Sequence, residues 1–481
     1  MTGGMINSFE LFIRMNYELG VQRLHEDVMK RRDFLGLSAA AMLSNLHSAN
    51  ATSATPTTSE GAAPLHLDAA PRLSLAERDR RWGTAREIMK KAGVEGLIVY
   101  GDRESSAPAP FAPDSYFTND RLGSIVVFKG DEPPVVLAFA PMAVSDHMQA
   151  RLRGDQQWLE PEQIYVGKSG AHLVSLLDRI GLTGKVGVIG LEPYPPFYFD
   201  GAIPFGIWNA VREAFPKAEF KPVYREYFML TAAHSAEELA LIRHAAGIGE
   251  KMCEAMRAAT KPGVSEADIV AATTAECLRN AGFTAEVLFG SGHEFIGWGP
   301  APWTYRAQPP RVIEEGDVVL AEVFAFYGMY ETQHQPAITV GRAHPEFERA
   351  AAVARACYEE GLQALRPGRT FGEVVDIMEA PLLASGGWHV HPLIHSINPY
   401  GPIGFGSAPG PESLPEASAY GSIGRLPTTW RDLPLQEGMS FAFETNCAFG
   451  RHLANLGGTV LVGADGGIEL NQNSTNVMRA G

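Results

Sequence analysis

Two glutamates occupy equivalent places in a segment that the chain contains twice. Glu322 follows Gly316 by six residues in the first copy, and Glu444 follows Gly438 by six residues in the second. Both lie in apolar runs whose alternation predicts a strand with the glutamate on one face. An edge-strand glutamate facing water is the alternative. A carboxylate flanked by apolar residues is rarely left without a partner, so the repeat favours a functional role.

The segments upstream of these strands are repeated as well. Lys261-Pro262-Gly263 and Arg366-Pro367-Gly368 each interrupt a helical pattern. A hydroxyl residue with an acid three positions later then begins the next helix, as in Thr370 and Glu373. The predicted order in each half is helix, break, helix, strands, a duplication of about one hundred residues per copy. Two such halves would bring the two glutamates near a pseudo-twofold axis, facing one cavity.

This duplicated pattern resembles the catalytic domain of the creatinase, prolidase, aminopeptidase P and methionine aminopeptidase superfamily. GDVVLAEVFAFYGMYETQHQPAITVG fits the first strand pair of that family, and EGMSFAFETNCAFG with LGGTVLVGADGGIEL fits its last two strands. The resemblance implies an α+β chain. A duplicated pita-bread catalytic domain would span residues 235–481, preceded by a smaller α/β domain like that of creatinase over residues 73–230.

The metal site that the resemblance implies is only partly present. Peptidases of the family hold two divalent ions with two Asp, one His and two Glu, and these positions fall here at Glu322, Gln333, His395, Glu444 and Gly457. Gln333 and Gly457 replace the carboxylates that bridge the ions in the family. Two carboxylates do not balance two divalent ions. We therefore expect no metal cofactor, or one divalent ion on Glu322, His395 and Glu444.

Acid–base catalysis by side chains is the alternative to metal, and creatinase, as the resemblance implies, works in this way. Two carboxylates in one partly dry cavity do not both ionise easily. One of Glu322 and Glu444 should therefore have a raised pKa and act as general acid while the other acts as base, together with His395. Gln333 and His334 are further catalytic candidates, as an amide-recognising or proton-shuttling pair. A purely structural role, with one side chain inward and one outward, is equally open.

Two long loops, residues 290–310 and 396–430, are rich in glycine, proline and aromatic residues. Loops of this length are uncommon in compact domains unless they are functional, and we expect them to shape the substrate pocket. Packing of the aromatics beneath the loops is the competing interpretation. His391 shares a strand face with His389, and a solvated or substrate-side face is favoured over a metal pair. The predicted substrate-binding residues are Trp303, Tyr305, His391 and Tyr400.

Length and composition restrict the remaining possibilities. A chain of 481 residues with 45% hydrophobic residues can form two domains with large cores. In the smaller domain, strands are expected at residues 96–100, 124–128, 134–139 and 185–190, with helices between them. The formal net charge of -15 argues against nucleic acid or an anionic membrane surface as a partner.

The N-terminal region carries an export pattern. Arg31-Arg32 precedes an apolar run from Phe34 to Leu46, and Ala49 and Ala51 form an A-x-A cleavage pattern. We predict a twin-arginine signal peptide over residues 29–51, after an N-terminal extension over 1–28 and before a linker over 52–72. The apolar run is too short to span a membrane. A buried helix instead would leave the RRDFL start and the linker unexplained.

The predicted function is an exported hydrolase, periplasmic or secreted, that acts on an amide or C-N bond of a small molecule or short peptide. The resemblance further implies a homodimer. Three alternatives stay open: a mononuclear metallopeptidase of the Xaa-Pro type, a lyase on the same fold, and a non-catalytic protein that binds a peptide or small ligand.

Overall fold

The computed structural model describes residues 70–102, 111–194, 198–294, 297–421 and 424–481. The predicted N-terminal extension and signal peptide, and the linker up to residue 69, lie outside these residues. Residues 66–481 form one compact unit. No helix in the described residues is long and apolar enough to cross a membrane.

The smaller sheet is mixed and has six strands in the order β4-β3-β2-β1-β5-β6. Strand β1 lies at its centre, antiparallel to β2 and parallel to β5, and all five of its residues are buried. The short runs of β-branched and other apolar residues in this sheet are typical of strands covered on both faces. The strands are β1 Gly96–Tyr100, β2 Ile125–Lys129, β3 Val135–Ala138, β4 Ile164–Val166, β5 Lys185–Ile189 and β6 Glu219–Pro222.

The first helix of this smaller region begins after Ser74. The Ser74 side chain accepts a hydrogen bond from the Glu77 amide and so caps the first turn. The helices are α2 Leu75–Ala92, α3 Pro113–Thr118, α4 Pro141–Arg153, α5 Gly170–Ile180, α6 Phe205–Ala214 and α7 Tyr224–Thr231, with a short 3-10 helix at Pro161–Gln163.

The larger sheet has eleven strands, of which eight follow the path β13-β12-β14-β15-β10-β9-β11-β17. Its long strands β9 and β14 carry Glu322 and Glu444. The strands are β7 Val287–Gly292, β8 Gly299–Pro300, β9 Val318–Tyr327, β10 Tyr330–His334, β11 Ala337–Thr339, β12 Ile394–Ile397, β13 Ile403–Gly404, β14 Ser440–Phe449, β15 His452–Val462, β16 Gly467–Glu469 and β17 Met478–Arg479.

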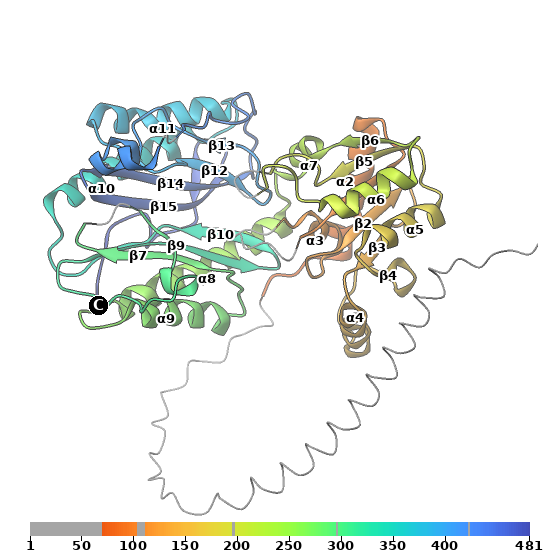
Figure 1. Ribbon diagram of the computed structural model, residues 1–481, viewed down its shortest axis with the longest axis horizontal. Coiled ribbons are helices and arrows are strands. Elements are labelled where there is room, and N and C mark those ends of the chain that lie inside the picture. The colour runs from red at the N-terminus through yellow and green to blue at the C-terminus, as the bar shows by residue number, and fades with distance from the viewer. Residues whose placement is uncertain (1–69, 103–110, 195–197, 295–296, 422–423) are drawn as a thin grey trace, which may run out of the picture. The chain divides into compact units, whose positions relative to one another are not determined.

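Two helix pairs accompany the strands of the larger sheet (Figure 1). They are α8 Ala236–Ala259 with α9 Glu266–Arg279, and α10 Pro345–Ala364 with α11 Phe371–Ser385. Helix α8 packs against β9 and β10, and α10 packs against β14 and β15. The predicted order of helix, helix and strands is therefore present in both halves, and the capping box of Thr370 and Glu373 is confirmed.

The two halves meet at the pairing of β10 with β15, where His334 lies opposite Gly458. One residue away, Gly457 on β15 lies opposite Glu444 on β14. The duplicated strands thereby lie near one another at the centre of the sheet, and this arrangement brings the two glutamates together.

Candidate functional site

Glu322 is a buried carboxyl on β9. The Trp298 indole Nε1 donates to its Oε2 at 3.3 Å. Burial, and then the negative charge of Glu444, raise the pKa of Glu322 well above its usual 4.5, and a hydrogen bond between the two carboxyls acts in the same direction. These surroundings therefore favour the protonated form of Glu322, with Glu444 as its neighbour.

His395 on β12 pairs with Glu444. Its Nε2 lies 2.9 Å from Glu444 Oε1, and its Nδ1 lies 3.0 Å from the Ser396 carbonyl oxygen. Both ring nitrogens thus face acceptors, which suits the doubly protonated imidazolium. Burial lowers the pKa of His395, but the hydrogen bond and charge of Glu444 outweigh burial, and the pKa is raised overall. Glu444 therefore favours the protonated form of His395.

Gln333 on β10 extends this pair. Its Oε1 lies 3.2 Å from His395 Nε2, while its Nε2 donates to the Tyr400 hydroxyl oxygen at 2.7 Å and to Glu331 Oε1 at 2.8 Å. The Tyr400 ring also stacks on the His395 ring, with 5.1 Å between centroids and 13° between planes. A continuous set of polar contacts therefore joins Glu322 and Glu444 to Glu331.

Glu331 is a site residue that the sequence analysis missed. The Tyr400 hydroxyl donates to its Oε1 at 3.1 Å. Burial raises the pKa of Glu331 to about 7, although the Gln333 amide and the charge of His395 lower it in part. Its position two residues before Gln333 on one strand is a signal that would have found it, because such residues share a face.

His334 lies on the other face of β10, away from Gln333. It packs on α8 so closely that a Cβ built on Gly249 would lie 1.8 Å from His334 Nε2. Its Nδ1 lies 3.6 Å from Glu250 Oε1. Strand alternation thus separates the two neighbours, and the structure does not bring His334 to the contacts of Glu322, His395 and Glu444.

The loop aromatics fall into different environments. Trp303 packs against the core beneath helices α8 and α9, as the packing interpretation expects. Tyr305 is 57% exposed, and the Arg306 guanidinium lies 5.3 Å from its ring centroid. His391 is half-buried, 4.4 Å from the His389 ring and 5.8 Å from the Phe405 ring. Of the four predicted substrate-binding residues, Tyr400 is the one whose contacts reach His395.

The side chains at the expected metal positions do not fit a dinuclear centre. Gln333 is a neutral amide. Gly457 has φ +147°, and a Cβ there would lie 2.0 Å from the Phe443 carbonyl oxygen, so the backbone admits no carboxylate. His395 Nε2 is already within hydrogen-bond distance of Glu444. Within the described ranges, no group of three or more His, Cys, Asp or Glu side chains is placed to hold a metal ion.

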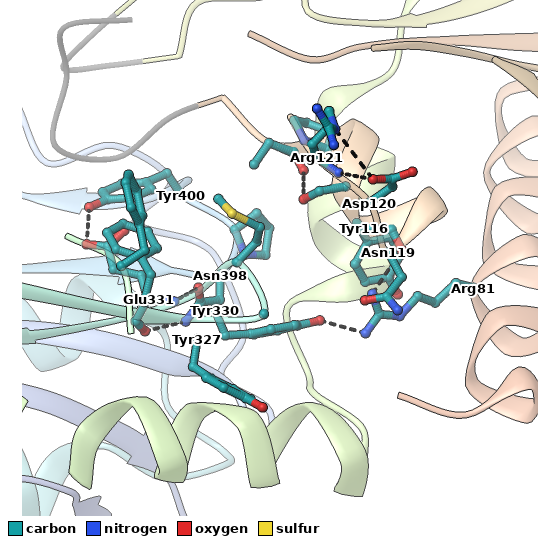
Figure 2. A pocket seen from close by; sticks show the side chains of 18 of the residues that line it. Arg81, Tyr116, Asn119, Asp120, Arg121, Tyr327, Tyr330, Glu331, Asn398 and Tyr400 are labelled. Atoms are coloured by element: carbon teal, nitrogen blue, oxygen red, sulfur yellow. Dashed lines mark hydrogen bonds and ion pairs between the residues drawn. The ribbon is translucent and has the colours of Figure 1, made fainter. Parts of the chain in front are cut away.

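A cavity of about 380 Å³ lies beside this cluster (Figure 2). Glu331 and Tyr400 line it, whereas Glu322, His395 and Glu444 are not among its lining residues. Glu322 and Glu444 are buried neighbours behind this lining, and the open space of this cavity begins at Glu331. Tyr116 and Arg121, from the smaller-sheet region, lie across the cavity from Glu331 in Figure 2.

Comparison with known proteins gives a consistent result. Residues 240–471 match the model of metallopeptidase family M24. A search of curated proteins gave no match. Among solved structures, the chain is similar to a prolidase from Pyrococcus horikoshii OT3, with 15% identity, TM-score 0.61, and 82% of this chain and 98% of that chain covered.

Two further solved structures show the same likeness. A dipeptidase PepE from Mycobacterium ulcerans has 17% identity and TM-score 0.61, with 85% of this chain and 99% of that chain covered. A Xaa-Pro dipeptidase from Bacillus anthracis has 16% identity and TM-score 0.59, with 84% and 99% covered. The family match and these neighbours support a hydrolase. Residues 240–471 are a domain of metallopeptidase family M24, with the pita-bread fold of the creatinase and prolidase superfamily.

Proposed function

We propose that this protein is an exported hydrolase that cleaves an amide or C-N bond of a small molecule or short peptide without a dinuclear metal centre. The observation that carries the proposal is a pair of neighbouring buried carboxyls with unlike partners. Glu322 has a strongly raised pKa, whereas Glu444 is paired with His395. This is the separation that acid–base hydrolysis requires of two like groups.

Each member of the cluster then has a distinct role. Glu444, oriented by His395, accepts a proton from water as the water oxygen attacks the substrate carbon. Glu322 donates its proton to the nitrogen that leaves when the C-N bond breaks. The hydrogen bond between the two carboxyls offers a route for the proton on Glu444 to return to Glu322. Gln333 holds His395 in place through its Oε1.

The family name implies a metal, but the donor set argues against a pair of ions. Two carboxyl groups, of which Glu322 has a raised pKa, and an imidazole engaged by Glu444 leave a second divalent ion without ligands. The proposal therefore assigns no step to a metal.

The test combines turnover with elemental analysis. Glu444→Gln and His395→Ala should each abolish hydrolysis of small amides and dipeptides while circular dichroism shows the fold retained. The exposed Glu359→Gln serves as a matched control and should keep full activity.

Purified protein should contain at most one tightly bound transition-metal ion per chain. Two ions per chain would overturn the metal argument, and full activity in both site variants would overturn the assignment. Absence of turnover on amides, dipeptides and betaine-like compounds would favour a non-catalytic binding protein.

A further inference from the structure

The cavity beside Glu331 is unusual in its lining. Seven of its lining residues are tyrosines, and they come from both the smaller-sheet region and the larger sheet. Five of these rings form a continuous series in which neighbouring centroids lie between 5.5 and 5.9 Å apart. The members in order are Tyr116, Tyr227, Tyr224, Tyr194 and Tyr400. The series ends at His395, on which Tyr400 stacks, so the cavity leads to the catalytic cluster.

The tyrosine side chains of this lining offer aromatic rings, and three of their hydroxyls are already engaged as donors. The Tyr224 hydroxyl donates to the Tyr400 carbonyl oxygen, the Tyr330 hydroxyl donates to Glu238, and the Tyr400 hydroxyl donates to Glu331. A primary ammonium group needs several acceptors, whereas a quaternary ammonium group needs none. Aromatic faces attract such cations through their quadrupole.

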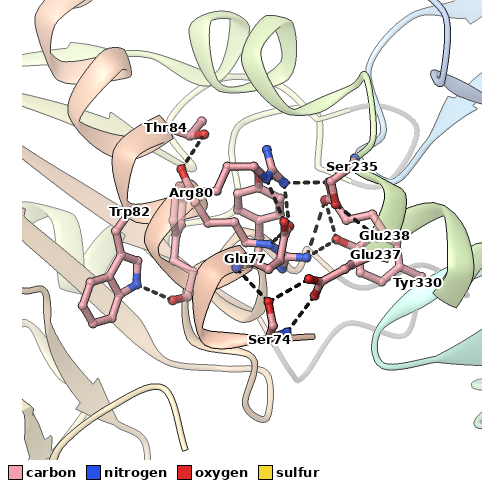
Figure 3. Close-up of polar contacts among 12 residues, drawn as sticks. Ser74, Glu77, Arg80, Trp82, Thr84, Ser235, Glu237, Glu238 and Tyr330 are labelled. Carbon is pink, nitrogen blue, oxygen red and sulfur yellow. Dashed lines mark hydrogen bonds and ion pairs between the residues drawn. The ribbon is translucent and has the colours of Figure 1, made fainter. Parts of the chain in front are cut away.

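The positively charged side chains that line the cavity are paired with carboxylates. Arg81 lines it, but Arg80 and Arg81 together face the two buried carboxylates of Glu77 and Glu238, so this group of four is neutral (Figure 3). Arg121 is likewise paired with Asp146 outside the lining. Positive charge on the lining is thus compensated.

Glu331 is the contrasting case. It has no ion-pair partner among the residues that the structure describes, and its side chain is 3% exposed. Burying a neutral apolar group beside this carboxyl would remove its remaining hydration, whereas a cation would compensate its charge. We propose that the cavity binds the quaternary ammonium group of the substrate, with the tyrosine rings as its walls and Glu331 as its counter-ion. The inference rests on the proposed function in one respect: it assumes that the substrate reaches the catalytic cluster through this cavity.

A proton is coupled to this binding. Because the pKa of Glu331 is about 7 without ligand, about half of the carboxyl is protonated at that pH. The cation binds the ionised form, so the affinity should rise between about pH 6 and pH 8, and binding near pH 7 should release a proton.

The test uses choline, its uncharged isostere 3,3-dimethyl-1-butanol, and ethanolamine, each titrated into the full chain by calorimetry. Choline should bind at least about tenfold more tightly than the isostere and than ethanolamine. Glu331→Gln should weaken choline binding roughly tenfold or more and leave the isostere unaffected. Tyr327, a lining residue, gives a second pair: Tyr327→Leu should weaken choline roughly 3- to 30-fold, and Tyr327→Phe should not.

Equal binding of choline and the isostere, or unchanged choline binding in Glu331→Gln, would overturn the inference. Tighter binding of ethanolamine would instead assign the cavity to primary amines. His395→Ala separates this inference from the proposed function, because it should abolish turnover but keep choline affinity. Hydrolysis of uncharged amides without choline binding would refute the inference alone, and choline binding without any hydrolysis would refute the proposed function alone.

Discussion

Glu322 and Glu444 are the same residue type at equivalent places of a duplicated segment, yet their surroundings differ. Glu444 lies 2.9 Å from His395 Nε2. Burial, and then the charge of Glu444, raise the pKa of Glu322, although the Trp298 indole N–H that donates to it lowers the pKa in part. Duplication thus supplies two carboxyls near one axis, and under the proposed function their unlike neighbours separate them into an acid and a base.

The raised pKa of Glu331 predicts a pH-dependent stability. The folded chain holds this proton up to about pH 7, whereas the unfolded chain releases it near pH 4.5. Unfolding between these values releases a proton, so Glu331 lowers the free energy of unfolding as pH rises through this window. The free energy of unfolding should therefore decrease less with pH in Glu331→Gln than in the unsubstituted protein, by up to roughly 3 kcal/mol. Urea denaturation at pH 5 and pH 8 measures the difference.

Part of the pH dependence should remain in the variant, because burial also raises the pKa of Asp114 to about 7. Asp114 lies on α3 and is unaffected by the substitution. An unchanged difference between pH 5 and pH 8 in Glu331→Gln would show that Glu331 titrates normally.

The sequence predicted some of the site residues and missed others. His395, Glu444 and Glu322 were found because their spacing follows a known motif, and the structure brings them together. For His334, the structure agrees with the alternative of one inward and one outward side chain, because strand alternation turns it toward α8. Glu331 was missed since its burial comes from Tyr400 and Gln333, and the contact with Tyr400 crosses 69 positions of the chain.

At the scale of elements, a buried ionic group ties α2 to α8 and β10 (Figure 3). Arg81 and Glu238 are each 1% exposed and lie 3.6 Å apart, and Tyr330 donates to Glu238 at 2.6 Å. Removing one member leaves buried positive charge without compensation. We expect Glu238→Gln to lower the free energy of unfolding by about 3 kcal/mol.

The control for this prediction is an exposed helical pair of the same kind, Arg355 with Glu359 on α10. Glu359→Gln should change the free energy of unfolding by less than about 0.5 kcal/mol. Urea titration of both variants gives the comparison. Equal, small losses would mean that the buried group contributes no more than a surface pair.

A second prediction concerns strand β15. Gly457→Glu restores the carboxylate of the peptidase pattern, but its Cβ would meet the Phe443 carbonyl oxygen at φ +147°. The strained backbone alone costs about 1–3 kcal/mol, and the clash adds to it. We expect a chain that is poorly soluble or unfolds at a much lower temperature. Gly83→Ala, at an open position inside α2, should leave the melting temperature unchanged or raise it. A stable Gly457→Glu protein that gains metal would contradict this account.

Helices and strands were predictable where the signal is local. Thr370 marks the start of a helix, and the run at 96–100 marks a strand. The order of eleven strands in one sheet was not predictable, because pairings such as His334 with Gly458 join residues from separate halves. Only the resemblance supplied that arrangement in advance.

At the scale of the whole molecule, the resemblance predicts a homodimer. Relatives with two domains commonly place the smaller domain of one subunit near the active site of the other. Light scattering at working concentration should therefore give about twice the mass of one chain, which is 52.0 kDa for the full sequence. A monomer mass would contradict the expectation.

Export is the other prediction at this scale. The twin arginines Arg31-Arg32, the apolar run and the Ala49–Ala51 pattern coincide over a short segment, so we expect cleavage after Ala51 and mature protein beginning at or near Thr52. The signal of this pathway is defined by its paired arginines. Replacing both with lysine keeps the charge but removes their planar geometry. Arg31→Lys with Arg32→Lys should therefore trap full-length precursor in the cytoplasm, as detected by fractionation and N-terminal sequencing, while unsubstituted protein reaches the periplasm or medium. Mature, active protein that retains Met1 in the cytoplasm would show that the segment is not a signal.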